Sequence, residues 1–174
     1  MHIKKFTFNP FQENTYVLHA AGEGIIIDPG CSDKNEQREL ETWLADNIVR
    51  PTRVLLTHAH IDHVMGCAWL KERYGLLTEV HRKDLPILEL AVQQGAMFGV
   101  ACEPVPAPKA FLEEGQVITL GKEHLDVLFV PGHAPGHVAF YNPKQQFLLG
   151  GNVPFHRSIG RTDLPGGDMD TLLK

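Results

Sequence analysis

Two histidine clusters that lie far apart in the chain place the strongest constraint on how this 174-residue sequence can fold. The first is HAHIDH at residues 58–63, and the second is HAPGH at residues 133–137. Each cluster follows an apolar run that is typical of a buried strand, at 52–58 and at 124–130. Because functional groups in α/β proteins collect where strands end, the sequence predicts a fold that brings these two strand ends together.

The first third of the chain is mostly strand-like and then becomes helical. Short runs rich in β-branched and aromatic residues predict strands at 4–8, 15–20 and 24–28. Apolar residues then recur at helical spacing over 32–48, which predicts an amphipathic helix. Asp33 and Glu36 at its start resemble a capping box.

The middle of the chain has the pattern of a parallel strand–helix–strand unit. A strand over 52–58 leads into a helix over 64–74, which Gly75 is placed to end, and a strand over 76–80 follows. A further helix is expected over 84–100.

The last third is predicted to return to strands. These are expected at 116–120, 124–130, 137–141 and 146–150. A loop rich in glycine and proline follows over 157–168, and Asp168 is placed to cap a final helix.

The first cluster has the residue types of a metal site. His58 and His60 are two residues apart, so in an extended backbone their side chains point to the same side. Asp62 and His63 follow in the predicted turn before the helix, where they can face a second point nearby. Imidazole suits zinc and iron, and a carboxylate supplies the negative charge that a divalent ion needs.

The second cluster is predicted to supply one more ligand. Pro131 and Gly132 end the strand and expose His133. Gly136 breaks the backbone again, so we expect His137 to support the site from behind or to pack in the core. The histidines 58, 60 and 133 then form a three-histidine site with an open fourth position, which is typical of catalytic zinc.

Together, the motifs THAHIDH, PGHAPGH and IDPG resemble those of the metallo-β-lactamase superfamily. Within it the sequence is most similar to small glyoxalase II-like (hydroxyacylglutathione hydrolase-like) hydrolases, and GRTDLPGGD at 160–168 supports that subgroup. The resemblance implies an α/β protein with the αβ/βα four-layer sandwich fold. It also implies a single domain over 1–174 that is short at its C-terminus, without the family's last strand and helix.

The resemblance also assigns roles to individual residues. The first metal would be held by His58, His60 and His133. Asp62 and His63 would help to hold the second metal. The residues implied to support these ligands without binding metal are Asp28, Asn14 and His137.

Two departures from the family pattern concern the second metal. The family has a bridging aspartate in a Gly-Asp pair where this chain has Gly151 and Asn152. A family motif similar to GHG, which carries the last histidine ligand, has no counterpart before Lys174. Because an asparagine brings no negative charge, we expect one firmly bound zinc ion and a second that is weakly bound or absent. Iron and manganese are the alternative metals.

The implied activity is hydrolysis of a thioester, such as a hydroxyacylglutathione, by a metal-activated water. Asp62 would orient this water or accept its proton. Arg161 is a candidate for binding an anionic group of the substrate, and the competing interpretation is an ordinary surface charge. Because Asn152 replaces the expected aspartate, this form of the enzyme is expected to be impaired.

Two other functions stay open. The GRTD segment also resembles persulfide dioxygenases of the same superfamily, which use a mononuclear iron. Alternatively, the change at Asn152 and the short C-terminus would leave a metal-binding protein with little turnover.

Composition narrows the partners and the compartment. The net charge of −5 and the pI near 6.0 argue against a nucleic-acid partner. No run approaches the roughly 20 apolar residues that a membrane span needs, so no membrane partner is expected. The three cysteines contain no CxxC pair, and the N-terminus has no signal-like apolar region, which favours the cytoplasm. An exposed sheet face at the short C-terminus would favour a homodimer.

Overall fold

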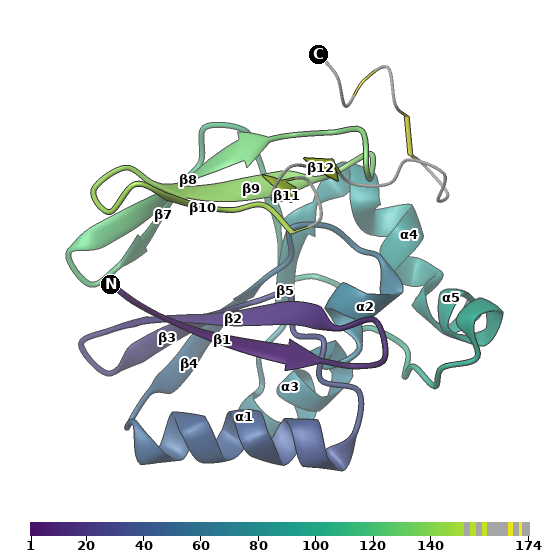
Figure 1. The fold of residues 1–174 in the computed structure, drawn as a ribbon, viewed down its shortest axis with the longest axis horizontal. Helices are drawn as coiled ribbons and strands as arrows, with labels where there is room; N and C mark the ends of the chain where they lie inside the picture. The colour runs from purple at the N-terminus through teal and green to yellow at the C-terminus, as the bar shows by residue number, and fades with distance from the viewer. Residues whose placement is uncertain (152–153, 156–157, 160–166, 169–170, 172–174) are drawn as a thin grey trace.

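A computed structural model describes residues 1–151, 154–155, 158–159, 167–168 and 171, and two β-sheets face each other in it (Figure 1). The first sheet has the strand order β1-β2-β3-β4-β5-β6. Its strands are β1 (His2–Phe8), β2 (Glu13–Ala20), β3 (Glu23–Ile27), β4 (Arg50–Leu55), β5 (Thr78–His81) and β6 (Ala110–Leu112). The second sheet has the order β10-β9-β8-β7. Its strands are β7 (Val117–Leu120), β8 (Glu123–Phe129), β9 (Val138–Asn142) and β10 (Phe147–Leu149). A small separate hairpin pairs β11 (Pro154–Phe155) with β12 (Ser158–Ile159).

The first sheet changes from antiparallel to parallel along its width. Strands β1, β2 and β3 pair antiparallel, and β3 to β6 pair parallel. The parallel connections contain α1 (Lys34–Asp46), α2 (Ile61–Val64) and α3 (Cys67–Tyr74). The parallel pairing of β4 with β5 confirms the predicted strand–helix–strand unit.

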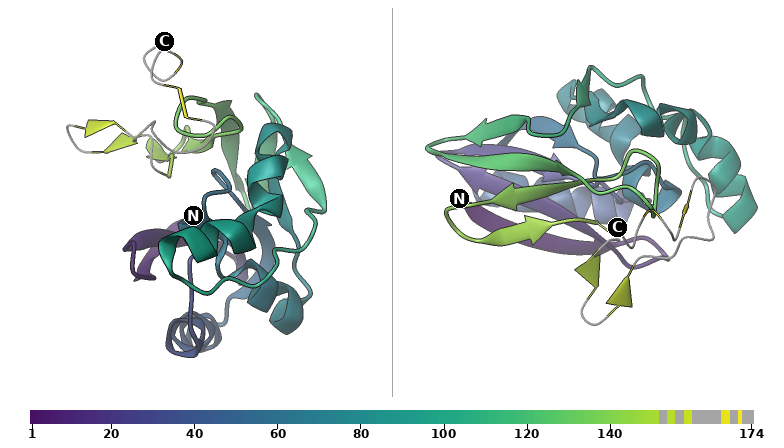
Figure 2. Two further views of the ribbon diagram at one scale, coloured as in Figure 1. Left: turned by 90° about the vertical axis from the view of Figure 1, so that its right-hand side faces the viewer. Right: turned by 90° about the horizontal axis from the view of Figure 1, so that it is seen from above.

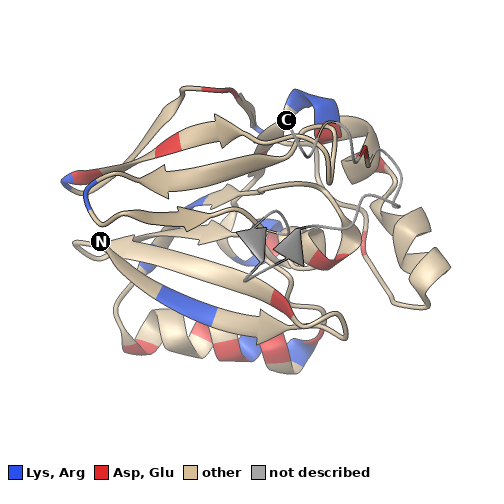
Figure 3. Ribbon diagram, turned by 45° about the horizontal axis from the view of Figure 1, so that its top comes forward, with Lys and Arg blue, Asp and Glu red and all other residues tan. Residues whose placement is uncertain are grey.

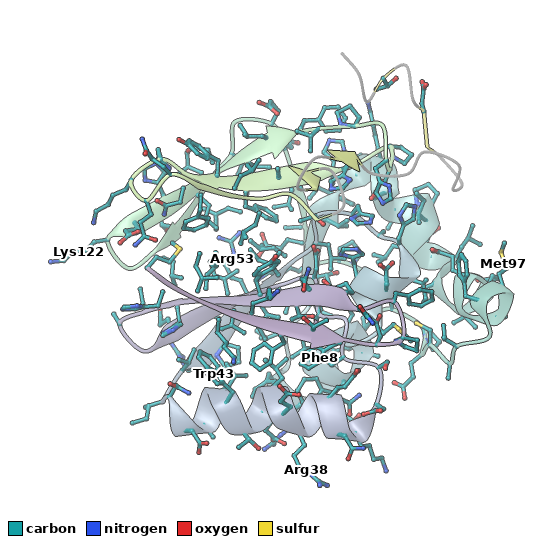
Figure 4. All side chains as sticks on the ribbon, viewed as in Figure 1. Phe8, Arg38, Trp43, Arg53, Met97 and Lys122 are labelled. Atoms are coloured by element: carbon teal, nitrogen blue, oxygen red, sulfur yellow. The ribbon has the colours of Figure 1, made fainter. Side chains whose placement is uncertain are left out.

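Apolar side chains form two layers of the core, one between the two sheets and one between the first sheet and its helices. Leu18, Ile27 and Leu55 of the first sheet pack against Val127 and Phe140 of the second, and all five are buried. The opposite face of the first sheet packs on α1 and α3. In Figure 4, Trp43 points from α1 toward this sheet and Arg38 points away from it. Figure 2 shows the second sheet lying over the first, and in the described part of the chain the outer face of the second sheet carries no helix. The described sheets and helices therefore form the α/β sandwich that the sequence predicts.

The start of α1 confirms one half of the predicted capping box. The Asp33 carboxylate accepts hydrogen bonds from the backbone N–H groups of Asn35 (2.7 Å) and Glu36 (3.0 Å). The Glu36 carboxylate does not return to Asp33. It accepts from the backbone N–H groups of Ser32 and Asn9, each at 2.6 Å, and so joins the helix to the β1–β2 turn.

The prediction of one helix over 64–74 is wrong at its start. The segment forms two helices, α2 and α3, which are separated at Gly66. A Cβ atom on Gly66 would lie 2.4 Å from Cys31 Sγ, and the Gly66 N–H donates to the Pro29 carbonyl at 2.8 Å. This tertiary contact divides the helix, and it places Asp62 and His63 on α2 instead of in a turn.

The segment expected to be one helix over 84–100 is also divided. It contains a short 3₁₀ turn (Arg82–Asp84), α4 (Leu85–Glu89) and α5 (Ala91–Phe98). Strand β6, which the sequence does not predict, follows this segment.

On the ribbon in Figure 3, acidic and basic residues are interspersed along α1. Within the described residues, every helix is too short or too polar to cross a membrane.

Most of the predicted 157–168 loop lies outside the described residues, but the Asp168 N–H donates to the Gly132 carbonyl at 2.7 Å. Thr171 Oγ1 donates to the Asp168 carboxylate at 2.8 Å.

Candidate metal centre

The two histidine clusters meet where the two sheets touch. The first cluster follows β4, and the second lies between β8 and β9. The Val138 N–H at the start of β9 donates to the Thr57 carbonyl at 2.8 Å, which joins the second sheet to the loop after β4. The Val130 N–H donates to the His137 carbonyl at 2.9 Å and closes the second loop on itself.

Three buried imidazoles converge at this junction. His133 Nε2 lies 3.0 Å from His60 Nδ1 and 3.2 Å from His58 Nε2. One ligand atom from each of the three rings lies within 4.8 Å of the others. Ring nitrogens this close suit a shared metal ion, because a lone pair on each can point to one centre. The structure thus brings together the three residues predicted to hold the first metal.

The tautomer of His58 is fixed by its neighbour Thr57. The Thr57 hydroxyl donates its one hydrogen to Asp28 Oδ2 at 2.6 Å, so its oxygen accepts from His58 Nδ1 at 3.0 Å. This leaves the lone pair on His58 Nε2, the atom that faces His133. Burial, followed by the nearby His63, lowers the pKa of His58 well below its usual value. A neutral ring with its lone pair at Nε2 fits a divalent metal.

His63 is held between carboxylates. Its Nδ1 lies 3.1 Å from Asp28 Oδ2, and its Nε2 lies 3.3 Å from Asp62 Oδ2. Burial alone would lower the pKa of His63, but Asp62 and Asp28 outweigh it and hold the pKa well above its usual value. Burial alone would raise the pKa of Asp62, but His63 outweighs it and the pKa is lowered. His63 Nε2 and the Asp62 carboxylate therefore lie side by side, and His63 would have to lose its Nε2 proton before it could bind a second metal there.

Asp28 contacts residues of both candidate metal positions. Its Oδ1 accepts a hydrogen bond from the Thr57 N–H at 2.7 Å. Its Oδ2 accepts a hydrogen bond from Thr57 Oγ1 and also lies close to His63 Nδ1. Its backbone has a φ of 51°, an uncommon left-handed conformation that Asp tolerates better than most residues. The carboxylate orients His58 through Thr57, and it orients His63 directly.

Sequence reasoning missed Glu13. Alternation along β2 buries Glu13 and Thr15 and exposes Asn14, the residue that the resemblance had assigned to support the ligands. The side chain of Asn14 instead accepts a hydrogen bond from Thr7 Oγ1 at 3.1 Å. Glu13 Oε1 lies 3.6 Å from His63 Nδ1. The predicted strand begins at residue 15, so the sequence pattern gives no signal for Glu13.

Gly30 lets Glu13 enter the site. A Cβ atom on Gly30 would lie 2.2 Å from Glu13 Oε2 and 2.7 Å from the Asp62 carbonyl. Burial raises the pKa of Glu13 well above its usual value, against the opposing effect of His63. Glu13 and Asp28 thus both face His63 Nδ1, on the opposite side of the ring from Asp62.

His137 supports the strand that leads to position 152. Its Nε2 donates to the Gly150 carbonyl at 2.9 Å, and both groups are buried. The next residue, Gly151, has a φ of 51°, and a Cβ atom there would lie 2.4 Å from Thr57 Oγ1. The end of β10 is therefore fixed against the site. Asn152 and Arg161, the other two predicted site residues, lie outside the described residues.

Replacing His137 with glutamine is expected to change how the stability of the metal-free protein depends on pH. Burial and the nearby His133 lower the pKa of His137 well below 6.5. Below that pH the unfolded chain binds a proton that the folded chain does not, so the wild type should lose about 1.4 kcal/mol per pH unit relative to His137→Gln. Urea unfolding of both proteins at pH 7.5, 6.5 and 5.5 measures this difference. A constant difference at all three values would contradict it.

Among the described residues, no cysteine belongs to a group that could hold a metal ion. Cys31 and Cys67 are buried, and burial raises the pKa of both thiols. Burial also raises the pKa of the half-buried Cys102 to about 11. All three are free, protonated thiols and therefore weak nucleophiles at neutral pH.

Comparisons with known proteins agree with this geometry. The profile of the Metallo-beta-lactamase superfamily matches residues 8–173. The chain is 32% identical over 174 residues to the probable metallo-hydrolase YqgX of Bacillus subtilis, and the alignment covers 99% of this chain and 81% of that protein. It is 31% identical over 176 residues to the hydroxyacylglutathione hydrolase GloC of Haemophilus influenzae, with the same 99% and 81% covered.

A solved structure gives the same result for the fold. The crystal structure of TTHA1623 in a di-iron-bound form matches with a TM-score of 0.87 and 39% identity, over 98% of this chain and 82% of that one. The family resemblance and the fold class are thereby confirmed. With its profile match, its relatives and its paired histidine loops, the chain belongs to the metallo-beta-lactamase superfamily, whose members are mostly metal-dependent hydrolases.

Proposed function

We propose that this protein is a zinc-dependent hydrolase of thioesters such as hydroxyacylglutathione. The observation that carries the proposal is the convergence of three buried imidazoles, His58, His60 and His133, beside the Asp62 carboxylate. The similarity to GloC of H. influenzae supports the thioester class. We further propose a cytoplasmic, homodimeric enzyme that acts on a small molecule, without a nucleic-acid or membrane partner.

The donor set indicates which residues would hold metal. His58, His60 and His133 would hold the first ion, and Asp62 with His63 would contribute to a second. An ion bound there supplies Lewis-acid chemistry, because it polarises a carbonyl oxygen and lowers the pKa of water. Zinc suits a set of three imidazole ligands. Iron is the alternative, since the related TTHA1623 has a di-iron-bound form.

The chain's own groups would position and move protons. Asp62 is ionised at neutral pH because its pKa is lowered, and its side chain is 18% exposed, so it can meet a water at the surface of the site. Its carboxylate would accept the proton of the attacking water. The departing thiol has a pKa of about 8.5 and leaves with little help from an acid. Thr57 would keep His58 in the required tautomer, and Asp28 would hold the Nδ1 side of the His63 ring.

A thiol-release assay tests this proposal. The purified chain, loaded with zinc, is mixed with hydroxyacyl-glutathione thioesters, and free thiol is followed with a colorimetric reagent. Turnover that disappears with a chelator and returns with zinc would support the proposal. Absence of thiol release from wild type and from Asn152→Asp, with metal bound, would contradict it. Oxygen uptake with a persulfide, without thiol release, would instead favour iron-dependent sulfur oxidation.

The change Asn152→Asp is expected to raise the tightly bound metal from one to two ions per chain. A carboxylate supplies the negative charge that an amide lacks. Because even an indirect partner of a ligand changes metal affinity by about 10–100-fold, the second ion should bind at least about 10-fold more tightly. Elemental analysis after dialysis counts the ions, and thiol release should rise with the second ion.

A charge-matched variant provides the control for this prediction. Asn35 is exposed in the first turn of α1, so Asn35→Asp adds the same charge away from the site. It should leave the metal count at one. Two tightly held ions in the wild type would refute the prediction.

A further inference from the structure

A single buried carboxylate, that of Asp84, touches both histidine loops. Its Oδ2 accepts from the Ala59 N–H at 2.9 Å, and its Oδ1 accepts from the Gly136 N–H at 2.5 Å. Ala59 lies between His58 and His60, and Gly136 immediately precedes His137. The carboxylate therefore bridges two loops that are far apart in the chain.

The surroundings of Asp84 are built around this bridge. Its side chain is fully buried, and a Cβ atom on Gly136 would lie 2.7 Å from Asp84 Oδ1. Only glycine at 136 lets the backbone approach this closely. Burial raises the pKa of Asp84 to about 6, while the N–H groups of Gly136 and Ala59 oppose that rise and favour the ionised form.

The usual alternative role of such a residue is helix capping. Asp84 immediately precedes α4, the position at which aspartate often accepts from the first turn of a helix. Here its side chain makes no capping hydrogen bond. Both carboxylate oxygens are used by the histidine loops instead.

We propose that Asp84 is the positioning residue that sets the distance between the His58–His60 pair and His133. Asp84 touches none of the three ligating side chains, so it acts through the backbone at Ala59 and Gly136. Losing one acceptor would release one loop and move its imidazole relative to the other two. This inference rests on the metal-binding part of the proposed function and is independent of the substrate.

Cobalt(II) binding to the full chain tests this role, because its visible absorption reports ligand geometry. Asp84→Asn keeps the size of the side chain but turns one acceptor into a donor that faces an N–H group. We expect the affinity for cobalt(II), measured by competition with a chromophoric chelator, to fall about 10–100-fold, with a changed absorption spectrum. Gly136→Ala disturbs the same contact from the other loop and should change the spectrum in the same direction.

The matched control is Asp33→Asn. Asp33 also accepts from two backbone N–H groups, but at α1, and it does so through one oxygen that asparagine retains. Its cobalt(II) affinity should stay within about twofold of the wild type, because asparagine caps helices as well as aspartate.

Two results would overturn the proposal. One is wild-type cobalt(II) affinity and spectrum in Asp84→Asn, whatever its stability. The other is an Asp84→Asn chain that stays unfolded with excess cobalt(II), because the proposed role assumes a folded core. A wild type that binds cobalt(II) but releases no thiol would contradict the thioester activity and leave this inference standing.

Discussion

Replacing His133 with alanine is expected to weaken binding of the first metal ion by more than about 100-fold. His133 Nε2 is the atom that lies near both His60 Nδ1 and His58 Nε2, so its loss leaves a two-histidine site from one loop. Mutating a residue that only supports a metal ligand lowers the metal affinity by about 10–100-fold, and the loss of a direct ligand should lower it further. Isothermal titration with zinc, or competition with a chelator, measures the loss. Thioester turnover should disappear with the metal.

The control for this prediction is His124→Ala. His124 lies on β8, the strand that leads to the His133 loop, but its side chain is 44% exposed and lies 3.6 Å from Asp126. Its metal affinity should equal that of the wild type. Equal affinities in His133→Ala and His124→Ala would show that the metal is held elsewhere.

Replacing Asp28 with alanine is expected to lower the free energy of unfolding by about 3–5 kcal/mol. The change leaves His63 with its Nδ1 buried and without the Asp28 oxygen at 3.1 Å. It also removes the acceptor of the Thr57 N–H and hydroxyl. Breaking a buried ionic pair typically costs about 3–5 kcal/mol, and each buried donor left without a partner adds to the loss. Urea unfolding of the metal-free protein measures the change.

Asp33→Ala provides the comparison for Asp28→Ala. It also removes a carboxylate that accepts two backbone hydrogen bonds, but at the exposed start of α1. A lost helix cap costs about 1 kcal/mol. If the two variants lost similar stability, the buried network around Asp28 would contribute little to folding.

The sequence predicts those features of the fold and the site in which both the residue types and their spacing are distinctive. The histidine pairs, the strand ends before them and the parallel unit between β4 and β5 all follow from local pattern. The roles of Glu13 and Asp84 do not follow from local pattern, because a single carboxylate in a strand or before a helix has no distinctive spacing. Their roles arise only from contacts with residues distant in the chain.

The errors in the helices have the same origin. Residues 64–74 have a continuous helical pattern, but the contact of Gly66 with Cys31 and Pro29 divides it. Glu36 is well placed for a capping box, but Ser32 and Asn9 offer it nearby donors from outside the helix. Tertiary contacts therefore overrode local preference at these positions.

Thr57 uses every polar group that it has. Its carbonyl accepts from Val138, its N–H donates to Asp28, and its hydroxyl both donates to Asp28 and accepts from His58. The valine side chain has the same shape but carries no hydrogen-bond donor or acceptor, and a side chain that ends in an amide or carboxylate is longer. In a saturation library this position should therefore accept only serine, so its tolerance to mutation is limited by hydrogen-bonding capacity more than by volume.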